Sequence, residues 1–165
     1  MHCHQIIRYS DEPCIGETPF GVSVSNFNSF TMTVSMSIDD GRLFDLLCNY
    51  LPTRDADFRL THDELDRLRE WKNDNPKVFE NVGFASCVET WVWEYMKADP
   101  NHKVKFIDKE DGTKHKMGWS HVCNGTSTMA QEYPDHFNDW VCENDDFITA
   151  DVWFQCCLLG DVVYG

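Results

Sequence analysis

The alternation of apolar and polar residues between residues 30 and 38 restricts the fold more than any other feature of the chain. This segment reads FTMTVSMSI, with an apolar side chain at every second position and a Thr or Ser between them. A period of two places all the apolar side chains on one face of a β-strand, which predicts a strand with one buried and one solvated face. A similar alternation starts at Phe20, and the mostly polar residues 25–29 separate the two runs. We therefore expect an antiparallel hairpin over about residues 20–38.

Three segments in the middle of the chain carry the capping and periodicity signals of amphipathic helices. The second and third segments each begin with a capping box, in which a Thr or Ser is followed three residues later by a Glu. Proline residues follow all three segments and end them. The expected helices cover about residues 41–51, 62–72 and 87–98, and their expected caps are Asp39 or Asp40, Thr61 and Ser86.

The remaining part of the chain adds a second hairpin and two further helices. Residues 103–122 contain two strand-like runs around Asp111-Gly112, which is a strong signal for a short hairpin turn. We also expect a short helix after Pro134, a helix that ends at Gly160, and a short strand at residues 162–164. Together the segments predict a single α+β domain, residues 1–165, in which antiparallel hairpins at about 20–38 and 103–122 pack with three to four helices.

Composition restricts the environment and the partners of such a domain. The chain has 28 Asp and Glu residues against 14 Lys and Arg residues, which gives a net charge of -14. This charge repels phosphate backbones and anionic lipids, so we expect neither direct nucleic-acid binding nor membrane binding. The chain begins without a basic and apolar leader, and its eight Cys residues are irregularly spaced. Both features favour a reduced, cytoplasmic protein over a disulfide-bonded secreted one.

The charges are distributed unevenly along the sequence. All 14 Lys and Arg residues lie before residue 117, whereas residues 117–165 contain eight acids and no Lys or Arg. High acidity can serve solubility alone, but a coherent outward patch of carboxylates also attracts a basic protein surface. The expected partner-binding residues are acids with two aromatic anchors among them: Glu132, Asp135, Asp139, Trp140, Glu143, Asp145, Asp146 and Phe147.

In size and acidity the chain resembles acidic phage antirestriction and anti-CRISPR proteins and bacterial toxin-immunity proteins. The likeness is one of composition and involves no specific motif. It implies a non-enzymatic, anti-defence type of inhibitor that occupies the basic surface of a nucleic-acid-handling enzyme or a toxin and thereby acts as a nucleic-acid mimic.

An enzymatic alternative is a thiol hydrolase with Cys87 as the nucleophile. Cys87 is expected at the start of a helix, where unpaired N–H groups and the helix dipole stabilise a thiolate. His121 would be the base, and Asp135 or Asn138 would orient it. The order of Cys, His and Asp is the one found in papain-like hydrolases.

A zinc site is a further alternative, although no cofactor is required by the leading hypothesis. Its four candidate ligands carry the nitrogen and sulfur atoms that zinc prefers in closed tetrahedral sites. These ligands are His121, Cys123, His136 and Cys142.

Overall fold

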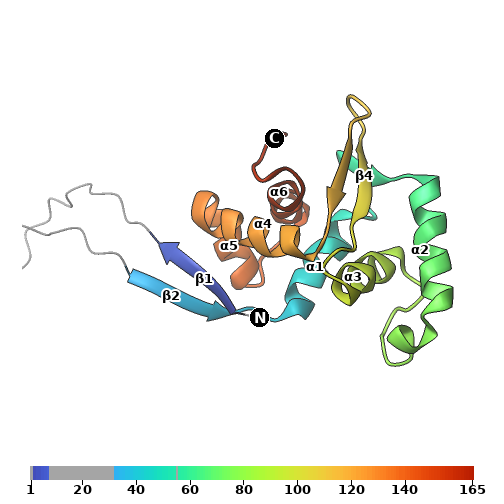
Figure 1. Cartoon of the computed structure of the whole chain (residues 1–165). Coiled ribbons are helices and arrows are strands. Elements are labelled where there is room, and N and C mark those ends of the chain that lie inside the picture. Colours follow the sequence, from blue (N-terminus) through green and yellow to red (C-terminus); the bar gives the residue numbers. More distant parts are fainter. Residues whose placement is uncertain (1, 8–31, 55) are drawn as a thin grey trace, which may run out of the picture.

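The structure is a computed structural model of the chain, and it describes residues 2–7, 32–54 and 56–165, with side chains described from Ile38 onward (Figure 1). Its fold is α+β, as the sequence predicts. The strands are β1 (His2–Ile7), β2 (Met32–Ser37), β3 (Phe58–Leu60), β4 (Val104–Asp108) and β5 (Lys114–Met117). The helices are α1 (Asp40–Tyr50), α2 (His62–Asp74), α3 (Val88–Ala98), α4 (Trp119–Glu132), α5 (Pro134–Val141) and α6 (Phe147–Leu159), with a 3-10 turn, η1 (Pro76–Phe79).

The alternating segment does form a strand, β2, and its partner among the described residues is β1. β2 pairs antiparallel with β1, so that His2 lies opposite Ser37 and Ile7 lies opposite Met32. The expected first strand of this hairpin, from Phe20, lies outside the described residues. The β1–β2 ribbon extends to one side of the helices, beyond α5, in Figure 1.

Of the three helix caps expected from the sequence, two form as side-chain caps. Asp39 accepts a hydrogen bond of 3.0 Å from the backbone N–H of Gly41, and Thr61 accepts one of 3.3 Å from that of Glu64. The third expectation is wrong by one residue, because Cys87 and not Ser86 is the N-cap of α3. The loop before α3 forms a turn, in which the Cys87 N–H donates to the carbonyl of Phe84 at 2.8 Å.

Strands β3, β4 and β5 form an antiparallel sheet with β4 in the middle. The β4–β5 hairpin confirms the expected turn, but the expectation of a strand reaching residue 122 is wrong. Gly118 ends the strand and caps α4, and a Cβ at this position would lie 2.5 Å from the carbonyl oxygen of His102. The chain therefore leaves the sheet at Gly118, and Trp119 and His121 lie on a helix.

Helix α6 is the centre of the core. Its residues from Thr149 to Leu158 are buried on nearly all sides, with only Asp151 half-buried, as expected for a helix with neighbours all round. It contacts α1, α4, α5 and β5, and Figure 1 shows it between α5 and the β4–β5 hairpin. The helix ends as predicted at Gly160, which adopts a left-handed φ of 84°. No helix among the described residues is long and apolar enough to cross a membrane.

The residues that follow α6 are fixed by one buried side chain and not by a strand. Gln155 Oε1 accepts hydrogen bonds from the N–H groups of Val163 at 2.9 Å and Tyr164 at 2.8 Å. Its Nε2 donates to the carbonyl of Tyr164 at 2.9 Å. The expected strand at residues 162–164 is therefore wrong, because the amide of Gln155 satisfies the backbone groups that a neighbouring strand would otherwise pair.

A buried carboxylate joins α2 to the sheet. Glu64 is 2% exposed and accepts hydrogen bonds from the Arg67 guanidinium and from the backbone N–H of Lys105, the latter at 2.9 Å. The Arg67 guanidinium also lies over the ring of Tyr95 on α3, 4.4 Å from its centroid. Such a charge is tolerated in the interior because it is paired and hydrogen-bonded.

Candidate protein-interaction site

The loop that joins α5 to α6, residues 142–146, carries three of the predicted carboxylates and is here called the acidic loop. It lies against α1, whose Arg42 forms the contact. Arg42 Nη1 donates to Glu143 Oε1 at 2.9 Å, and its Nη2 lies 3.9 Å from Asp145 Oδ1. Asn49, two turns further along α1, donates to Asp145 Oδ2 at 3.1 Å. One cation from the front of the chain therefore partly neutralises the loop.

Two further carboxylates extend this acidic surface. Asp45 is exposed on α1, three residues after Arg42 and four before Asn49, so it lies on the helix face that meets the acidic loop. Asp139 lies on α5, and its carbonyl accepts a hydrogen bond of 2.8 Å from the N–H of Asn144. Arg42 pairs with only two of these five carboxylates, Glu143 and Asp145, so the surface remains negative.

The acidic loop is held in a defined conformation. Asp146 caps α6 by accepting a hydrogen bond of 2.9 Å from the N–H of Thr149. Glu143 adopts a left-handed φ of 60°, which costs a non-glycine residue about 1–2 kcal/mol. The contacts of Arg42 and the α6 cap hold the loop in this strained form, so its carboxylates are arranged before a partner arrives.

The two aromatic residues predicted as anchors point mostly into the protein. Trp140 is only 3% exposed, and its Nε1 donates to the carbonyl of Arg42 at 3.2 Å. Phe147 is half-buried, and its ring stacks on that of Tyr50 with the centroids 6.0 Å apart. The prediction of Trp140 as an exposed anchor is therefore wrong, because the ring fills the core between α1 and α5.

The next residue after each aromatic faces outward instead. Val141 is 46% exposed at the end of α5, and Ile148 is 59% exposed in the first turn of α6. They flank the acidic loop on both sides. Exposed apolar side chains beside charged ones are typical of interaction surfaces, whose contacts combine an apolar centre with a polar rim.

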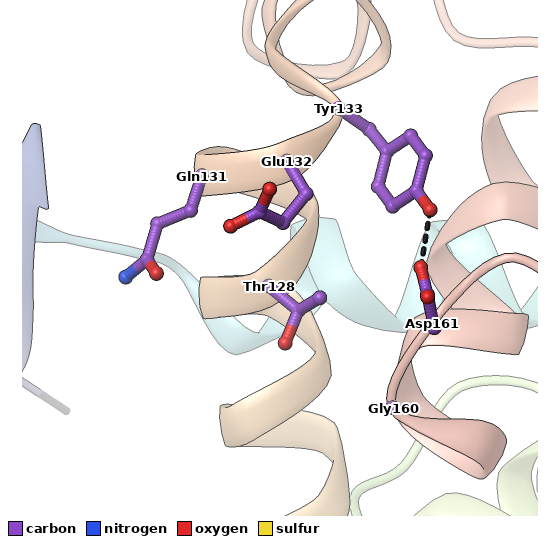
Figure 2. Close-up of a pocket in the computed structure, with 6 residues that line it drawn as sticks. All are labelled: Thr128, Gln131, Glu132, Tyr133, Gly160 and Asp161. Atoms are coloured by element: carbon purple, nitrogen blue, oxygen red, sulfur yellow. Dashed lines mark hydrogen bonds between the residues drawn. The ribbon is translucent and has the colours of Figure 1, made fainter. Parts of the chain in front are cut away.

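The other carboxylates of residues 117–165 lie elsewhere, so the eight acids do not form one patch. Glu132 and Asp161 line a hollow of about 530 Å³ at the end of α4, together with Thr128, Gln131, Tyr133 and Gly160 (Figure 2). Asp135 is exposed in the first turn of α5, between this hollow and the acidic loop. Asp151 is half-buried below the C-terminal residues, where burial raises its pKa.

In the hollow, the Tyr133 hydroxyl donates a hydrogen bond to the carboxylate of Asp161, as Figure 2 shows. This bond raises the pKa of Tyr133 and lowers the pKa of Asp161, because it needs a protonated phenol and a charged carboxylate. The backbone N–H of Val162 also donates to the Tyr133 oxygen, at 3.2 Å. Asp161 is thus partly satisfied within the chain, whereas Glu132 is exposed.

The residues of the thiol-hydrolase alternative lie at the ends of different helices. Cys87 precedes α3, whereas His121 lies near Lys103, which follows the other end of α3. A helix of 11 residues is about 16 Å long, so the thiol and the imidazole are not in hydrogen-bonding reach. His121 lies in the first turn of α4 and Asp135 lies beyond its other end, so the length of this helix, about 20 Å, separates them. Burial and, secondly, the charge of Lys103 lower the pKa of His121.

The four residues of the zinc alternative are not brought together either. Among the residues with described side chains, no group of three or more His, Cys, Asp or Glu could hold a metal ion. Cys123 Sγ donates to the carbonyl of Trp119 at 3.1 Å, and Cys142 Sγ lies 3.8 Å from Asn138 Oδ1. His136 keeps a buried Nδ1 atom without a hydrogen-bond partner, but its ring does not meet the two thiols in a common site.

One exposed aromatic residue was not singled out from the sequence. Phe84 is 79% exposed and adopts a left-handed φ of 58°, a rare conformation for a bulky residue. Its loop leads to Cys87, which lies close to Cys48 on α1. The Gly-Phe dipeptide at residues 83–84 marks a loop in the sequence, but no local pattern indicates that the aromatic ring remains outside the core.

Comparison with known proteins does not assign the chain to a class. No family model, no curated protein and no solved structure matches it. The charges and the exposed side chains of this chain are therefore the features that bear on its function.

Proposed function

We propose that this protein is a small acidic inhibitor that binds a basic surface of a nucleic-acid-handling enzyme or a toxin through the acidic loop and its flanking residues. The observation that carries the proposal is the exposure of Val141 and Ile148 on both sides of the loop. An acidic surface that serves solubility alone gains nothing from exposed apolar side chains, which lower solubility. Binding uses both features.

The two kinds of side chain have separate roles in such binding. Carboxylates act over a distance and accelerate the approach of a basic surface, with an effect that salt weakens. Val141 and Ile148 act only on contact, where removal of their apolar surface from water stabilises the complex by about 25 cal/mol per Å². Together they give a fast association and a complex that persists.

The fixed conformation of the loop favours tight binding. A flexible acidic segment loses conformational entropy when it is ordered by a partner, whereas a segment that is already ordered avoids this cost. Arg42 and the cap formed by Asp146 provide that order in the free protein. A surface of fixed carboxylates can also occupy a groove that normally binds phosphates, which is how the nucleic-acid mimicry would operate.

The test uses immobilised protein and an extract of the source cells, in parallel with three variants. One variant reverses charge on α1, α5 and the loop (Asp45→Lys, Asp139→Lys, Glu143→Lys), and one removes the apolar residues (Val141→Ser, Ile148→Ser). The matched control reverses three exposed acids on and after α2 (Glu70→Lys, Asp74→Lys, Glu80→Lys). We expect a basic protein to be retained by the wild type and the control and lost by the other two.

The retained protein is then purified and titrated against the wild type at rising salt. We expect the Kd to rise at least tenfold between 50 and 300 mM salt, and duplex DNA to compete if the partner handles nucleic acid. Equal retention by all four forms, or a Kd that salt leaves unchanged, would contradict the proposal. All variants are first compared with the wild type by circular dichroism and thermal unfolding.

A further inference from the structure

The outer face of the three-stranded sheet is basic, although the protein as a whole is acidic. The inner face packs on α6, where the rings of Phe106 and Phe154 meet with their centroids 5.1 Å apart. Residues on the outer face alternate with these buried ones along each strand. Four exposed cations lie there, and we call them the basic sheet face: Arg59, Lys105, Lys114 and Lys116.

The strand register sets these cations side by side. Lys105 on β4 lies directly opposite Lys116 on β5, and Ile107 lies between Arg59 and Lys114. Like charges directly opposite each other destabilise a sheet. Among the residues with described side chains, the one acid in ion-pair range of these cations is Glu64, which lies 4.0 Å from Lys105 Nζ and is already bonded to Arg67. The face therefore holds positive charge that its own neighbours do not balance.

Strand β5 is also an open edge. The Asp108 N–H donates to the carbonyl of Thr113 at 2.9 Å, which makes these two residues a hydrogen-bonded pair. In an antiparallel ladder such pairs alternate, so the N–H and C=O groups of Lys114 and Lys116 point away from β4. The described part of the chain supplies no strand on that side of the sheet.

We propose that an extended acidic segment of another protein adds to β5 as a fourth strand. Its backbone would pair with the outward N–H and C=O groups of Lys114 and Lys116, as in other cases of strand addition. Its carboxylates at alternate positions would lie on the same face as the two lysines. An extended acidic segment therefore satisfies both the open edge of β5 and the unbalanced positive charge of the basic sheet face.

The same features disfavour other occupants. A second β5 strand from another copy would set lysine against lysine, which is one way in which edge strands resist self-association. Nucleic acid offers acceptors but cannot satisfy the outward C=O groups with a matching ladder, and the net charge of -14 repels it. This surface does not include the acidic loop, and the inference does not depend on the proposed function.

The test uses a synthetic peptide of alternating Glu and Val, blocked at both ends and labelled for fluorescence anisotropy. One comparison probe is a peptide of the same composition with its Glu residues clustered, and another is a labelled DNA duplex. Two further probes are N-methylated forms of the alternating peptide, one methylated at its odd-numbered residues and the other at its even-numbered residues. We expect the alternating peptide to bind at least tenfold more tightly than the clustered peptide, and at least one N-methylated form to lose binding tenfold. Hydrogen exchange at the amides of Lys114 and Lys116 should slow on binding.

The variant Lys114→Glu/Lys116→Glu should lose at least tenfold in affinity for the peptide. The matched control, Arg69→Glu/Lys77→Glu, makes the same change of charge on exposed positions of α2 and η1 and should bind as the wild type does. Any of three results overturns the proposal. These are no binding at millimolar peptide, peptide binding without protection of the two amides, and tighter binding of the DNA duplex than of the peptide.

Discussion

Gly125 of α4 lies against the backbone of Cys157 of α6, so closely that a Cβ on Gly125 would be 2.4 Å from the Cα of Cys157. The two helices therefore touch backbone to backbone at this point. One residue further on, the Trp153 Nε1 donates a hydrogen bond of 3.0 Å to the buried hydroxyl of Thr126. The position of the central helix depends on this contact, since no side chain separates the two helices there.

Replacement of Gly125 by Ala should therefore destabilise the protein. The added methyl group forces α4 and α6 apart, and overpacking of this kind costs typically about 1–3 kcal/mol. Urea unfolding followed by circular dichroism measures the change. Gly83→Ala is the control, because a Cβ there meets nothing within 4 Å. Equal stability of the two variants would show that the helices can separate without cost.

The Glu64–Arg67 pair and the Asp66–Arg69 pair have the same spacing on α2 but differ in burial, with side-chain exposures of 2% for Glu64 and 64% for Asp66. Glu64→Ala should lower the free energy of unfolding by about 3 kcal/mol, because it leaves the guanidinium and the Lys105 N–H without their partner. Asp66→Ala should change it by less than about 1 kcal/mol. Unfolding experiments on both variants in the same buffer test the difference, and similar losses would contradict it.

Gln155→Leu should release the residues that follow α6. The substitution keeps the size of the buried side chain but leaves the N–H groups of Val163 and Tyr164 without an acceptor, at a cost of about 2 kcal/mol. Hydrogen exchange at these two amides should become as fast as in an unstructured peptide. Gln131→Leu, on the exposed face of α4, should leave their exchange unchanged.

The contact between Tyr164 and Asp108 should make stability sensitive to alkaline pH. The Tyr164 hydroxyl donates to Asp108 Oδ2 at 2.5 Å, and this bond raises the pKa of Tyr164 from 10.0 to about 12. Because the pKa in the folded state is above that in the unfolded state, the stabilisation is complete below pH 10 and declines as the pH rises toward 12.

The measurement is urea unfolding of the wild type and of Tyr164→Phe across this range. The difference in the free energy of unfolding should be constant up to about pH 9 and shrink above the reference pKa of 10.0. A difference that disappears already near neutral pH, or that persists above pH 12, would show that the bond does not act in this way.

Local signals were sufficient to predict most elements of this fold. The caps Asp39 and Thr61, the turn at Asp111-Gly112 and the end of α6 at Gly160 depend on neighbours in the sequence, and the structure confirms them. The failures depend on contacts between distant segments. Gly118 lies against the backbone of His102 and begins α4 where a strand was expected, and Val163 and Tyr164 bond to Gln155 instead of to a strand.

The candidate site was predicted only in part, for the same reason. The absence of Lys and Arg after residue 116 located the acidic loop, but no local pattern could show that Arg42, about 100 residues earlier, pairs with it. The larger aromatic residues Trp140 and Phe147 pack inward, whereas the smaller residues that follow them, Val141 and Ile148, are exposed. Size indicates which residue a core can accommodate, and the smaller neighbour then remains exposed.

The basic sheet face lies on β3–β5 and the acidic loop lies between α5 and α6, so the described part of the chain separates charges of opposite sign. A dipolar body experiences a torque in the field of any charged neighbour, over distances comparable to the Debye length of about 8 Å. The protein would therefore rotate toward one preferred approach before first touching another molecule. Orientation during diffusion, and not only the final fit, would thus distinguish a partner with one sign of charge from a partner with the other.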